Sequence, residues 1–531
     1  VETALFGYDA AKIIGSYCNF KLSVRNKVVA QFHEWMTGTG ILYLKYAAPQ
    51  IATVFTTHAT VLGRSIAGNN LPLYSGLKTF NGEDKAREFN VVAKQSLEKI
   101  SALQADSFTT VSSITAAECV QFHGKAVDVI TPNGFEDNFV PKNGDFTTKR
   151  NNARNQLLQV TQALLGYEID QNAIFAGTCG RYEFKNKGID LFIDALGELN
   201  LNKNFNKTLV AFILIPSYHH GPRKDLLDNL NGTNPEPLNG NPYLTHYLHD
   251  PDFDPILNRI HSNNLLNSKT DKVKVVFVPS YLNGEDGIFN IHYYDALIGL
   301  DLTVFGSYYE PWGYTPLESI AFFIPTITTV LAGFGLWAKE LGADFDKGVE
   351  VVNRTDTNDK EVVSLISNKL QYFSTLPQEK INDIRKNAHQ ISLNALWENL
   401  ISYYYQAFAV ALNKIESRRE KISLLQPTET KQLVEVIHSN KPNWRKMIIE
   451  SNLPENLKAL DELSRNLWWT WNYEAIELFE SIDAKLWEKY KKNTILILKE
   501  VTQERITELG NDKEFIEKLN RVYGKFKAYL N

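Results

Sequence analysis

The stretch SYYEPWGYTPLES, residues 307–319, places two carboxylates, Glu310 and Glu318, on either side of a Pro-Trp-Gly turn. The segment before it, LTVF, is typical of a buried strand, so the turn follows the carboxyl end of a strand, where parallel sheets bind ligands. The rigid aromatic turn favours a fixed, partly desolvated acceptor at Glu310. From the residues alone, a solvated loop carboxylate remains the alternative.

Glu318 also has a structural interpretation. Thr315, Pro316 and Glu318 have the residue types of the cap, first and third positions of a helix, which is a capping box. The pattern therefore predicts a helix capped by Thr315. Glu318 can satisfy the end of this helix and still face a ligand hydroxyl.

A compact cationic loop, GRYEFKNKGID (180–190), follows the apolar strand AIFAGT and precedes a helix. It brings Arg181, Lys185 and Lys187 to one strand end between two glycines. Fixed cations in such a place suit a diphosphate, because preorganised donors stabilise the charge that builds on a departing phosphate. A surface charge cluster is the alternative.

Two further strand-end turns carry histidines. TTHATVLGR brings His58 and Arg64 into a turn after the strand IATVF, and QFHEWMTG brings His33 and Glu34 into a similar position. Each histidine alone fits a structural role as well as a catalytic one. VLAGFG offers the Gly333 backbone to a phosphate or simply forms a turn, and Tyr293 can stack on a base or pack in a core.

Composition narrows the class of protein. A chain of 531 residues predicts two or three domains, and its longest apolar runs are too short to span a bilayer. The 56 basic residues are scattered, which argues against a nucleic-acid surface, and the three cysteines lack ligand or disulfide spacing. We therefore expect a soluble, cytoplasmic protein with no nucleic acid or membrane partner.

Short apolar runs alternate with amphipathic segments through about residue 413, which predicts parallel α/β layers. The region of about 217–271 is rich in Asn, Pro and Gly and is predicted to be an exposed, loop-bearing insertion. A linker is expected over 414–450. The segment 451–531 has a helical period and clustered tryptophans, which favour a helix-packing core over a sugar platform.

These segments together resemble glycogen synthase of the animal and fungal type, glycosyltransferase family three. FHEW, TTHATVLGR, FTTVSSITAAE, PNGF, GRYEFKNKGID and SYYEPWGYTPLES through TITTVLAGFG occur in the family's order and span residues 1 to about 412. The resemblance implies a GT-B enzyme with two Rossmann-like domains facing a cleft, at 1–172 and 173–413. It also implies retention of configuration, a nucleotide-diphosphoglucose donor with UDP-glucose favoured, a glycogen or α-1,4-glucan acceptor, and no metal or other cofactor.

By the same resemblance, Glu310 binds the donor glucose, Arg181 and Lys187 bind the diphosphate, and His58 faces the donor sugar. Glu318 binds the ribose and Tyr293 stacks on the base. The resemblance also places the following residues near the substrates: Glu34, Arg64, Tyr309, Trp312, Gly313, Tyr314, Thr315 and Gly333.

The chain also departs from the family pattern. The family's Lys-Val-Gly-Gly loop lies upstream of Val1, so the first domain is expected to be truncated at its start. EKINDIRKNAHQ (379–390) has only Arg385 and Lys386 where the family has an arginine-rich helix, so sugar-phosphate activation is expected to be lost. The short insertion leaves a homo-oligomer possible but puts the family's tetramer in question.

The tail from about residue 452, LPENLKALDELSRNLWWTWNYEAIELF, is similar to the N-terminal region of a bacterial α-glucan phosphorylase. A fusion with phosphorylase catalytic domains downstream is therefore expected. Two alternatives to a glycogen synthase stay open: another retaining GT-B glucosyltransferase, such as a sucrose or trehalose type, and a noncatalytic glucan-binding scaffold.

Overall fold

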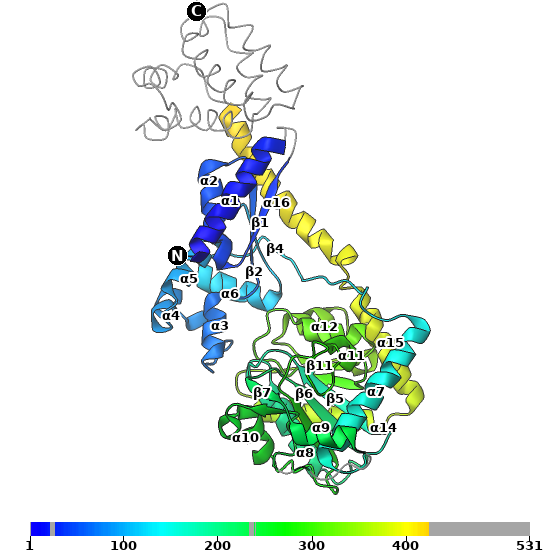
Figure 1. Ribbon diagram of the computed structural model, residues 1–531. Helices are drawn as coiled ribbons and strands as arrows, with labels where there is room; N and C mark the ends of the chain where they lie inside the picture. The colour runs from blue at the N-terminus through cyan, green and yellow to red at the C-terminus, as the bar shows by residue number, and fades with distance from the viewer. Residues whose placement is uncertain (1, 22–26, 233–237, 239, 424–531) are drawn as a thin grey trace, which may run out of the picture.

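The first α/β unit is built on a four-stranded parallel sheet with the order β1-β2-β3-β4 (Figure 1). The computed structural model describes residues 2–21, 27–232, 238 and 240–423. The strands of this sheet are β1 (Val29–His33), β2 (Ala52–Thr57), β3 (Ser107–Thr110) and β4 (Val129–Ile130). The helices of this part of the chain are α1 (Glu2–Lys21), η1 (Trp35–Thr37), α2 (Gly38–Ala47), α3 (Val61–Gly68), η2 (Leu77–Thr79), α4 (Gly82–Glu88), α5 (Val92–Gln104) and α6 (Ser113–His123).

The second unit is built on a six-stranded parallel sheet with the order β12-β11-β10-β5-β6-β9. Its strands are β5 (Ile174–Cys179), β6 (Leu209–Leu214), β9 (Val273–Val278), β10 (Leu302–Val304), β11 (Thr326–Thr329) and β12 (Val349–Val352). Its helices include α8 (Ile189–Leu201), α11 (Tyr293–Leu297), α12 (Tyr314–Ala321), α13 (Gly333–Glu340), η4 (Phe345–Lys347), α14 (Asp359–Thr375) and α15 (Gln378–Leu393).

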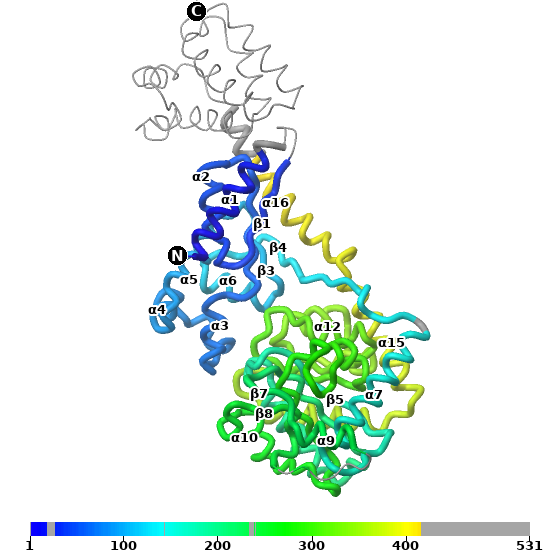
Figure 2. Tube along the Cα trace, in the orientation of Figure 1, coloured from blue at the N-terminus to red at the C-terminus, as the bar shows by residue number. Residues whose placement is uncertain are grey.

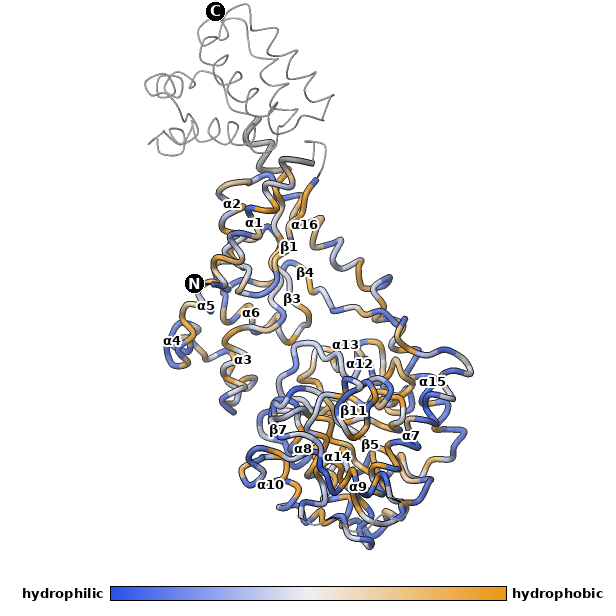
Figure 3. Tube along the Cα trace, viewed as in Figure 1, coloured by the Kyte–Doolittle hydropathy of each residue, from blue (hydrophilic) through white to orange (hydrophobic). Residues whose placement is uncertain are grey.

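Strands β5 and β6 lie inside the second sheet and β9 lies at its edge, and the largely apolar sequences of all three reflect their burial. Every residue of β5, β6 and β9 is buried, because helices cover both faces of the sheet. Figure 3 shows hydrophobic residues concentrated in the interior of this unit and hydrophilic residues in its outer loops. The predicted parallel α/β architecture with two Rossmann-like units is therefore confirmed.

Helix α7 (Asn143–Leu165) corrects the expected domain boundary at residue 172. Its buried residues, among them Leu157 and Val160, belong to the core of the second unit together with Phe175 and Phe212. The chain therefore reaches the second unit before α7. Amphipathic spacing shows that a helix packs on something, but it does not show which sheet it covers.

Helix α16 (Trp397–Ser423) runs back from the second unit to the first (Figure 1). Ala411 and Ile415 of this helix pack on Ala52 and Val54 of β2. The C-terminal end of the range 173–413 therefore covers the first sheet, which corrects the expected assignment of this helix to the second domain.

The two crossings of the chain between the units run close together (Figure 2), and an isolated bridge between Phe135 and Leu396 joins them. The Phe135 amide donates to the carbonyl of Ala395 at 3.1 Å, and the Trp397 amide donates to the carbonyl of Phe135 at 3.1 Å. These bonds tie the outgoing and returning segments together.

The insertion between β6 and β9 is more ordered than the sequence suggested. It forms an antiparallel ribbon of β7 (His219–Pro222) and β8 (His246–Leu248), with helices α9 (Lys224–Asn231), η3 (Pro251–Phe253) and α10 (Pro255–Ser262). Ile256 and Ile260 of α10 are fully buried in the second core. The predicted exposed loop is corrected, because these apolar residues anchor the insertion to the sheet.

The predicted linker begins inside α16, and both its remainder from residue 424 and the predicted helical module at 451–531 lie outside the described residues. Within the described part, no helix is long and apolar enough to cross a membrane.

Candidate active site

The loops that follow β5 and β10 meet because their strands are neighbours in the second sheet. Gly188 has a φ of 66°, and a Cβ added there would lie 2.0 Å from the carbonyl oxygen of Gly306, so only glycine permits the close approach. Lys187 Nζ then donates to Glu310 Oε2, with side chains only 13% and 14% exposed. The structure thus joins the predicted cation and the predicted carboxylate as a largely buried ion pair.

Arg181 lies apart from this pair. Its side chain is 63% exposed and its Nη2 lies 2.9 Å from Glu183 Oε1. The structure therefore brings Lys187, but not Arg181, against Glu310, and the diphosphate role of Arg181 stays a prediction.

The turn that carries Glu310 is held by the start of α13. The carbonyl of Glu310 accepts from the Gly333 amide at 2.9 Å. A Cβ on Gly333 would lie 2.1 Å from the Pro311 oxygen and 2.7 Å from Cβ of Ser112, which belongs to the first unit. The Gly333 amide is bonded within the protein and the glycine permits the two units to touch, while its predicted contact with substrate stays a prediction.

Gly313 adopts a left-handed conformation with a φ of 115° and is the N-cap of α12, which begins at Tyr314 without a side-chain cap. The predicted capping box is therefore wrong, because the helix starts one residue before Thr315. The Ser319 hydroxyl donates to the Thr315 carbonyl at 2.9 Å. The half-exposed Tyr314 donates to the Gly134 carbonyl at 3.4 Å.

Trp312 is buried, with its ring 5.9 Å from that of Trp337. Its indole N–H has no hydrogen-bond partner among the described residues. The indole therefore stiffens the turn beside Glu310, and its N–H is a donor that the described chain leaves unused.

Glu318 and Tyr293 lie behind the end of β5. Glu318 accepts from the Tyr294 hydroxyl at 2.9 Å, and burial raises the pKa of Glu318. The Tyr293 hydroxyl lies 2.9 Å from Cys179 Sγ, at the last residue of β5. The two side chains share one corner of the site, and their contacts with ribose and base stay predictions.

The first unit contributes a pair of histidines. His33 ends β1, His58 follows β2, and these strands are paired in the sheet. His33 Nδ1 and His58 Nε2 lie 2.9 Å apart. Burial lowers the pKa of both, and the neighbouring His33 adds to the effect that brings the pKa of His58 to about 4. Both imidazoles are therefore neutral near pH 7, and one donates to the other.

Glu34 holds the turn that carries His58. Its Oε1 accepts from the amides of His58 at 2.8 Å and Ala59 at 3.2 Å. Its φ of 64° and ψ of 160° are strained for a residue with a side chain, which costs on the order of 1–3 kcal/mol. Burial raises the pKa of Glu34, while the exposed Arg64 on α3 acts to lower it. Glu34 therefore positions the His58 turn through Oε1, and its contact with substrate stays a prediction.

Tyr309 joins the two units. It is 3% exposed and packs in a cluster with Ala59 and Leu62 of the first unit. Its hydroxyl lies 3.3 Å from Glu118 Oε2, which also accepts from Thr60 Oγ1 at 2.6 Å. The side chain is buried in this junction, one residue before Glu310 and close to the turn that carries His58, and its predicted substrate contact stays a prediction.

Tyr308 adds a second link between the units. Its hydroxyl accepts from the Leu73 amide at 2.8 Å and donates to Asp356. Asp356 in turn accepts from the Ser75 amide at 2.6 Å. The two tyrosines of the motif therefore place Glu310 against the first unit.

Sequence reasoning did not assign a role to Gly188, Glu118 or His33, although all three lie in segments that it identified. The glycine before α8 and the histidine at the end of β1 were visible signals. Glu118 lies inside helix α6, and no local sequence signal marked it. Across the described residues, no group of three or more His, Cys, Asp or Glu side chains is placed to hold a metal ion.

A sequence model described as glycogen synthase matches residues 1–227 and 237–463. A second model, described as a protein of unknown function (DUF3417), matches residues 453–531. The first match covers all the motifs of the site described above.

The glycogen [starch] synthase of Neurospora crassa is 29% identical over 479 residues, covering 78% of this chain and 66% of that protein. The liver glycogen [starch] synthase of Rattus norvegicus is 30% identical over 442 residues, covering 73% and 63%. The glycogen [starch] synthase of Dictyostelium discoideum is 30% identical over 470 residues, covering 78% of this chain and 53% of that protein. The chain therefore spans between about half and two-thirds of the length of these curated relatives.

Among solved structures, the catalytic domain of starch synthase IV from Arabidopsis thaliana, bound to ADP and acarbose, aligns with a TM-score of 0.46 and 15% identity over 77% of each chain.

The sequence model of the family spans most of this chain and includes the Lys187 and Glu310 motifs and both histidine turns. The chain belongs to the glycogen synthase family.

Proposed function

We propose that this chain transfers glucose, with retention of configuration, from a nucleotide-diphosphoglucose to the non-reducing end of an α-1,4-glucan. The observation that carries this proposal is the buried pair of Lys187 and Glu310 at adjoining strand ends, in a chain of the glycogen synthase family. The relatives that match it carry the name glycogen [starch] synthase, which supports the same activity. UDP-glucose is the favoured donor.

Lys187 supplies a fixed positive charge for the leaving diphosphate, and Glu310 accepts from hydroxyls of the glucose. Their mutual ion pair keeps both groups in place before the donor binds, so little reorganisation accompanies the reaction. In the transfer, the bond from C1 to the phosphate oxygen breaks as the acceptor hydroxyl attacks the same face. The proton of that hydroxyl passes to the departing phosphate, and positioning replaces a covalent nucleophile.

The other predicted contacts complete this site. His58, held neutral, faces the donor sugar as an uncharged hydrogen-bonding group. Glu318 and Tyr293 bind the nucleoside, and Arg181 turns from Glu183 toward the diphosphate. No metal is needed, because the lysine and arginine neutralise the phosphates; transfer should persist in EDTA.

The test is glucose transfer by the full-length product from UDP-glucose and ADP-glucose to glycogen, with the variant Lys187→Ala. We expect kcat to fall about 10²–10³-fold, the usual cost of removing one preorganised donor from a site of developing charge. Lys203→Ala, an exposed lysine after the end of α8 and outside this loop, is the matched control and should retain activity. Unchanged transfer in Lys187→Ala would refute the assignment of the leaving-group site.

The same assay separates the alternatives. Transfer to sucrose- or trehalose-type acceptors instead of glycogen would show another retaining glucosyltransferase. Binding of glucan without any transfer would show a noncatalytic scaffold.

The segment 451–531 is proposed to be the N-terminal region of an α-glucan phosphorylase joined to the synthase in a cytoplasmic protein. Its resemblance to that region and its match to a separate sequence model support a distinct module. Phosphorolysis of glycogen by the full-length product would support the fusion. A homo-oligomer, if formed, should be visible by light scattering of that product.

A further inference from the structure

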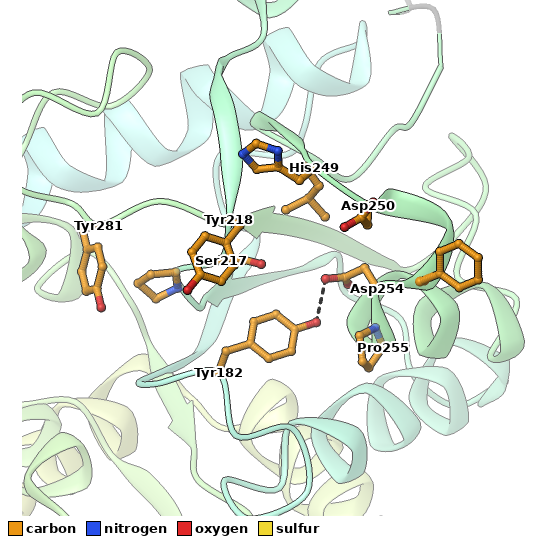
Figure 4. Close-up of a pocket in the computed structure, with 11 residues that line it drawn as sticks. Tyr182, Ser217, Tyr218, His249, Asp250, Asp254, Pro255 and Tyr281 are labelled. Carbon is orange, nitrogen blue, oxygen red and sulfur yellow. Dashed lines mark hydrogen bonds between the residues drawn. The ribbon is translucent and has the colours of Figure 1, made fainter.

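Buried carboxyl groups anchor functional loops in both units. In the second unit, the Tyr182 hydroxyl donates to Asp254 Oδ2 at 2.7 Å (Figure 4), and the Leu257 amide donates to Asp254 Oδ1 at 2.9 Å. Tyr182 is the residue after Arg181, so Asp254 fixes one end of the cationic loop. In the first unit, Glu98 of α5 is a buried carboxyl group that no step of the proposed transfer uses.

Glu98 spans the turn that carries His58. This turn runs from Thr57, the last residue of β2, to Val61, the first residue of α3. The Thr57 hydroxyl donates to Glu98 Oε1 at 3.3 Å, and the Val61 amide donates to Glu98 Oε2 at 3.0 Å. A single carboxyl group from α5 thus holds both ends of the turn, with His58 between them.

Two other carboxyl groups hold the middle of the turn. Glu34 accepts from the His58 amide at 2.8 Å and from the amide that follows it. Glu118 accepts from the Thr60 hydroxyl at 2.6 Å. The turn therefore rests on carboxyl groups from the end of β1, from α5 and from α6, and Glu98 contributes the bonds at its two ends.

Glu98 acts as an uncharged group. Its side chain is fully buried, and burial raises its pKa well above the ordinary value; the carboxyl groups of Glu34 and Glu118 add to this rise, whereas the bonds from the turn oppose it. His123 Nε2 lies 3.4 Å from Glu98 Oε2, and burial brings the pKa of His123 to about 4. A neutral acid beside a neutral imidazole avoids the cost of a buried charge, so glutamine is a close replacement for Glu98.

Helix α3 does not depend on Glu98 for its cap. Thr60 is the N-cap, and its hydroxyl oxygen accepts from the Gly63 amide at 2.9 Å. What Glu98 adds is the position of the turn relative to α5. We propose that Glu98 is a positioning residue for glucose transfer, because it fixes the turn that presents His58 to the donor sugar. This role rests on the proposed function, in which His58 faces the donor glucose.

The test measures glucose transfer to glycogen by the full-length wild type and by Glu98→Leu, which has a side chain of similar size without acceptor oxygens. The kcat should fall about 10–10²-fold, the cost of displacing a positioned group by up to about 1 Å. The KM for UDP-glucose should change little, because Lys187 and the nucleoside contacts lie in the second unit. Glu98→Gln keeps an acceptor oxygen and should retain most of the kcat.

Val61→Pro removes the other partner of the same bond. Proline is tolerated at the first position of a helix, and Thr60 before it is already extended, with a φ of −66° and a ψ of 141°. The kcat should fall at least about tenfold, since the start of α3 is no longer tied to α5. This variant leaves the carboxyl group in place, so it decides the question if Glu98→Leu does not fold; wild-type kcat in Val61→Pro would overturn the proposal.

Gln95→Leu is the matched control. Gln95 is 3% exposed on the same helix and donates to the Phe122 carbonyl of α6 at 3.3 Å, not to the turn. Its Tm should fall while its kcat stays that of the wild type. Equal losses of kcat in Gln95→Leu and Glu98→Leu would overturn the proposal, because they would reflect general loosening of the first unit. Wild-type kcat in Glu98→Leu, or a Glu98→Gln variant as impaired as Glu98→Leu, would also overturn it.

Hydrogen exchange followed by mass spectrometry examines the turn without catalysis. The segment that contains His58 and Val61 should lose protection in Glu98→Leu and keep it in Glu98→Gln. A loss of kcat without a loss of protection would overturn the positioning role. If the wild type transfers no glucose, the proposed function fails, and exchange then decides whether Glu98 holds the turn. If the wild type transfers glucose and Glu98→Leu keeps its kcat and its protection, only the role of Glu98 fails.

Discussion

In the first unit, ionisable side chains near the strand ends are buried beside hydrogen-bond donors, whereas in the second unit Lys187 and Glu310 are buried against each other. Burial raises the pKa of Glu34 and brings the pKa of Glu118 to about 7. It also brings the pKa of His58 to about 4. In these three first-unit side chains, burial thus favours the uncharged form.

Asp301 shows the opposite behaviour in the second unit. Burial acts to raise its pKa, but the guanidinium groups of Arg150 and Arg154 outweigh burial and hold the pKa below its ordinary value. Charge persists in a buried place only where a counter-charge accompanies it. The comparison teaches that a counter-charge outweighs burial at Asp301, whereas burial without one favours the neutral forms of Glu118 and His58.

The largest change in activity is expected from removing the charge of Glu310. Glu310→Gln keeps the size of the side chain but leaves the Lys187 ammonium largely buried without its partner. We expect kcat for glucose transfer to fall about 10²–10³-fold, as for loss of one preorganised polar group at the reacting centre. Glu340→Gln on the exposed end of α13 is the control. Equal kcat values for the two variants would contradict the role of Glu310.

A second change tests whether the first unit keeps its acids neutral. The folded pKa of Glu118, about 7, lies above its ordinary value of 4.5, so its contribution to stability is complete below about pH 4.5 and is lost as the pH rises to about 7. The full shift corresponds to roughly 3 kcal/mol. The Tm of Glu118→Gln minus that of the wild type should therefore be higher at pH 8 than at pH 5. A difference in Tm that is the same at both pH values would show that Glu118 is not neutral when folded.

The histidine pair can be separated by His33→Ala. Loss of His33 should raise the pKa of His58, because His33 contributes to the lowering after burial, and the acid limb of the kcat profile should move to higher pH. At pH 7 we expect about a tenfold loss of kcat with little change in the KM for the donor, since His33 positions another residue. His33→Gln, which can still hydrogen-bond to His58, should retain much of the kcat that His33→Ala loses. An unmoved acid limb in His33→Ala would rule out the coupling; exposed His261→Ala is the control.

The smallest expected effect concerns the link between the units. Tyr308→Phe removes the hydroxyl that accepts from the Leu73 amide and donates to Asp356. The free energy of unfolding in urea should fall by about 1 kcal/mol, the usual worth of such a hydrogen bond. Tyr372→Phe, at an exposed ring on α14, should not change it. Equal losses in both variants would mean that the junction contributes nothing.

Much of the second sheet was predictable because β5, β6 and β9 are fully buried and read as largely apolar runs. The sequence identified the loops of Lys187 and Glu310 at strand ends, but their direct pairing is seen only in the structure. Other features depend on contacts distant in sequence: Tyr309 meets Glu118 across 191 positions, and nothing near either residue announces that contact. The start of α12 was missed because the left-handed conformation of Gly313 replaces the side-chain cap that Thr315 suggested.

The paired crossings at Phe135 and Ala395–Trp397 determine how the two units can move. Because the two covalent connections are joined at one place, they favour rotation of the units about that place and resist sliding or separation of the units. A rotation that separates the facing loops would break the bond from the Leu73 amide to the Tyr308 hydroxyl and the contact of Tyr309 with Glu118.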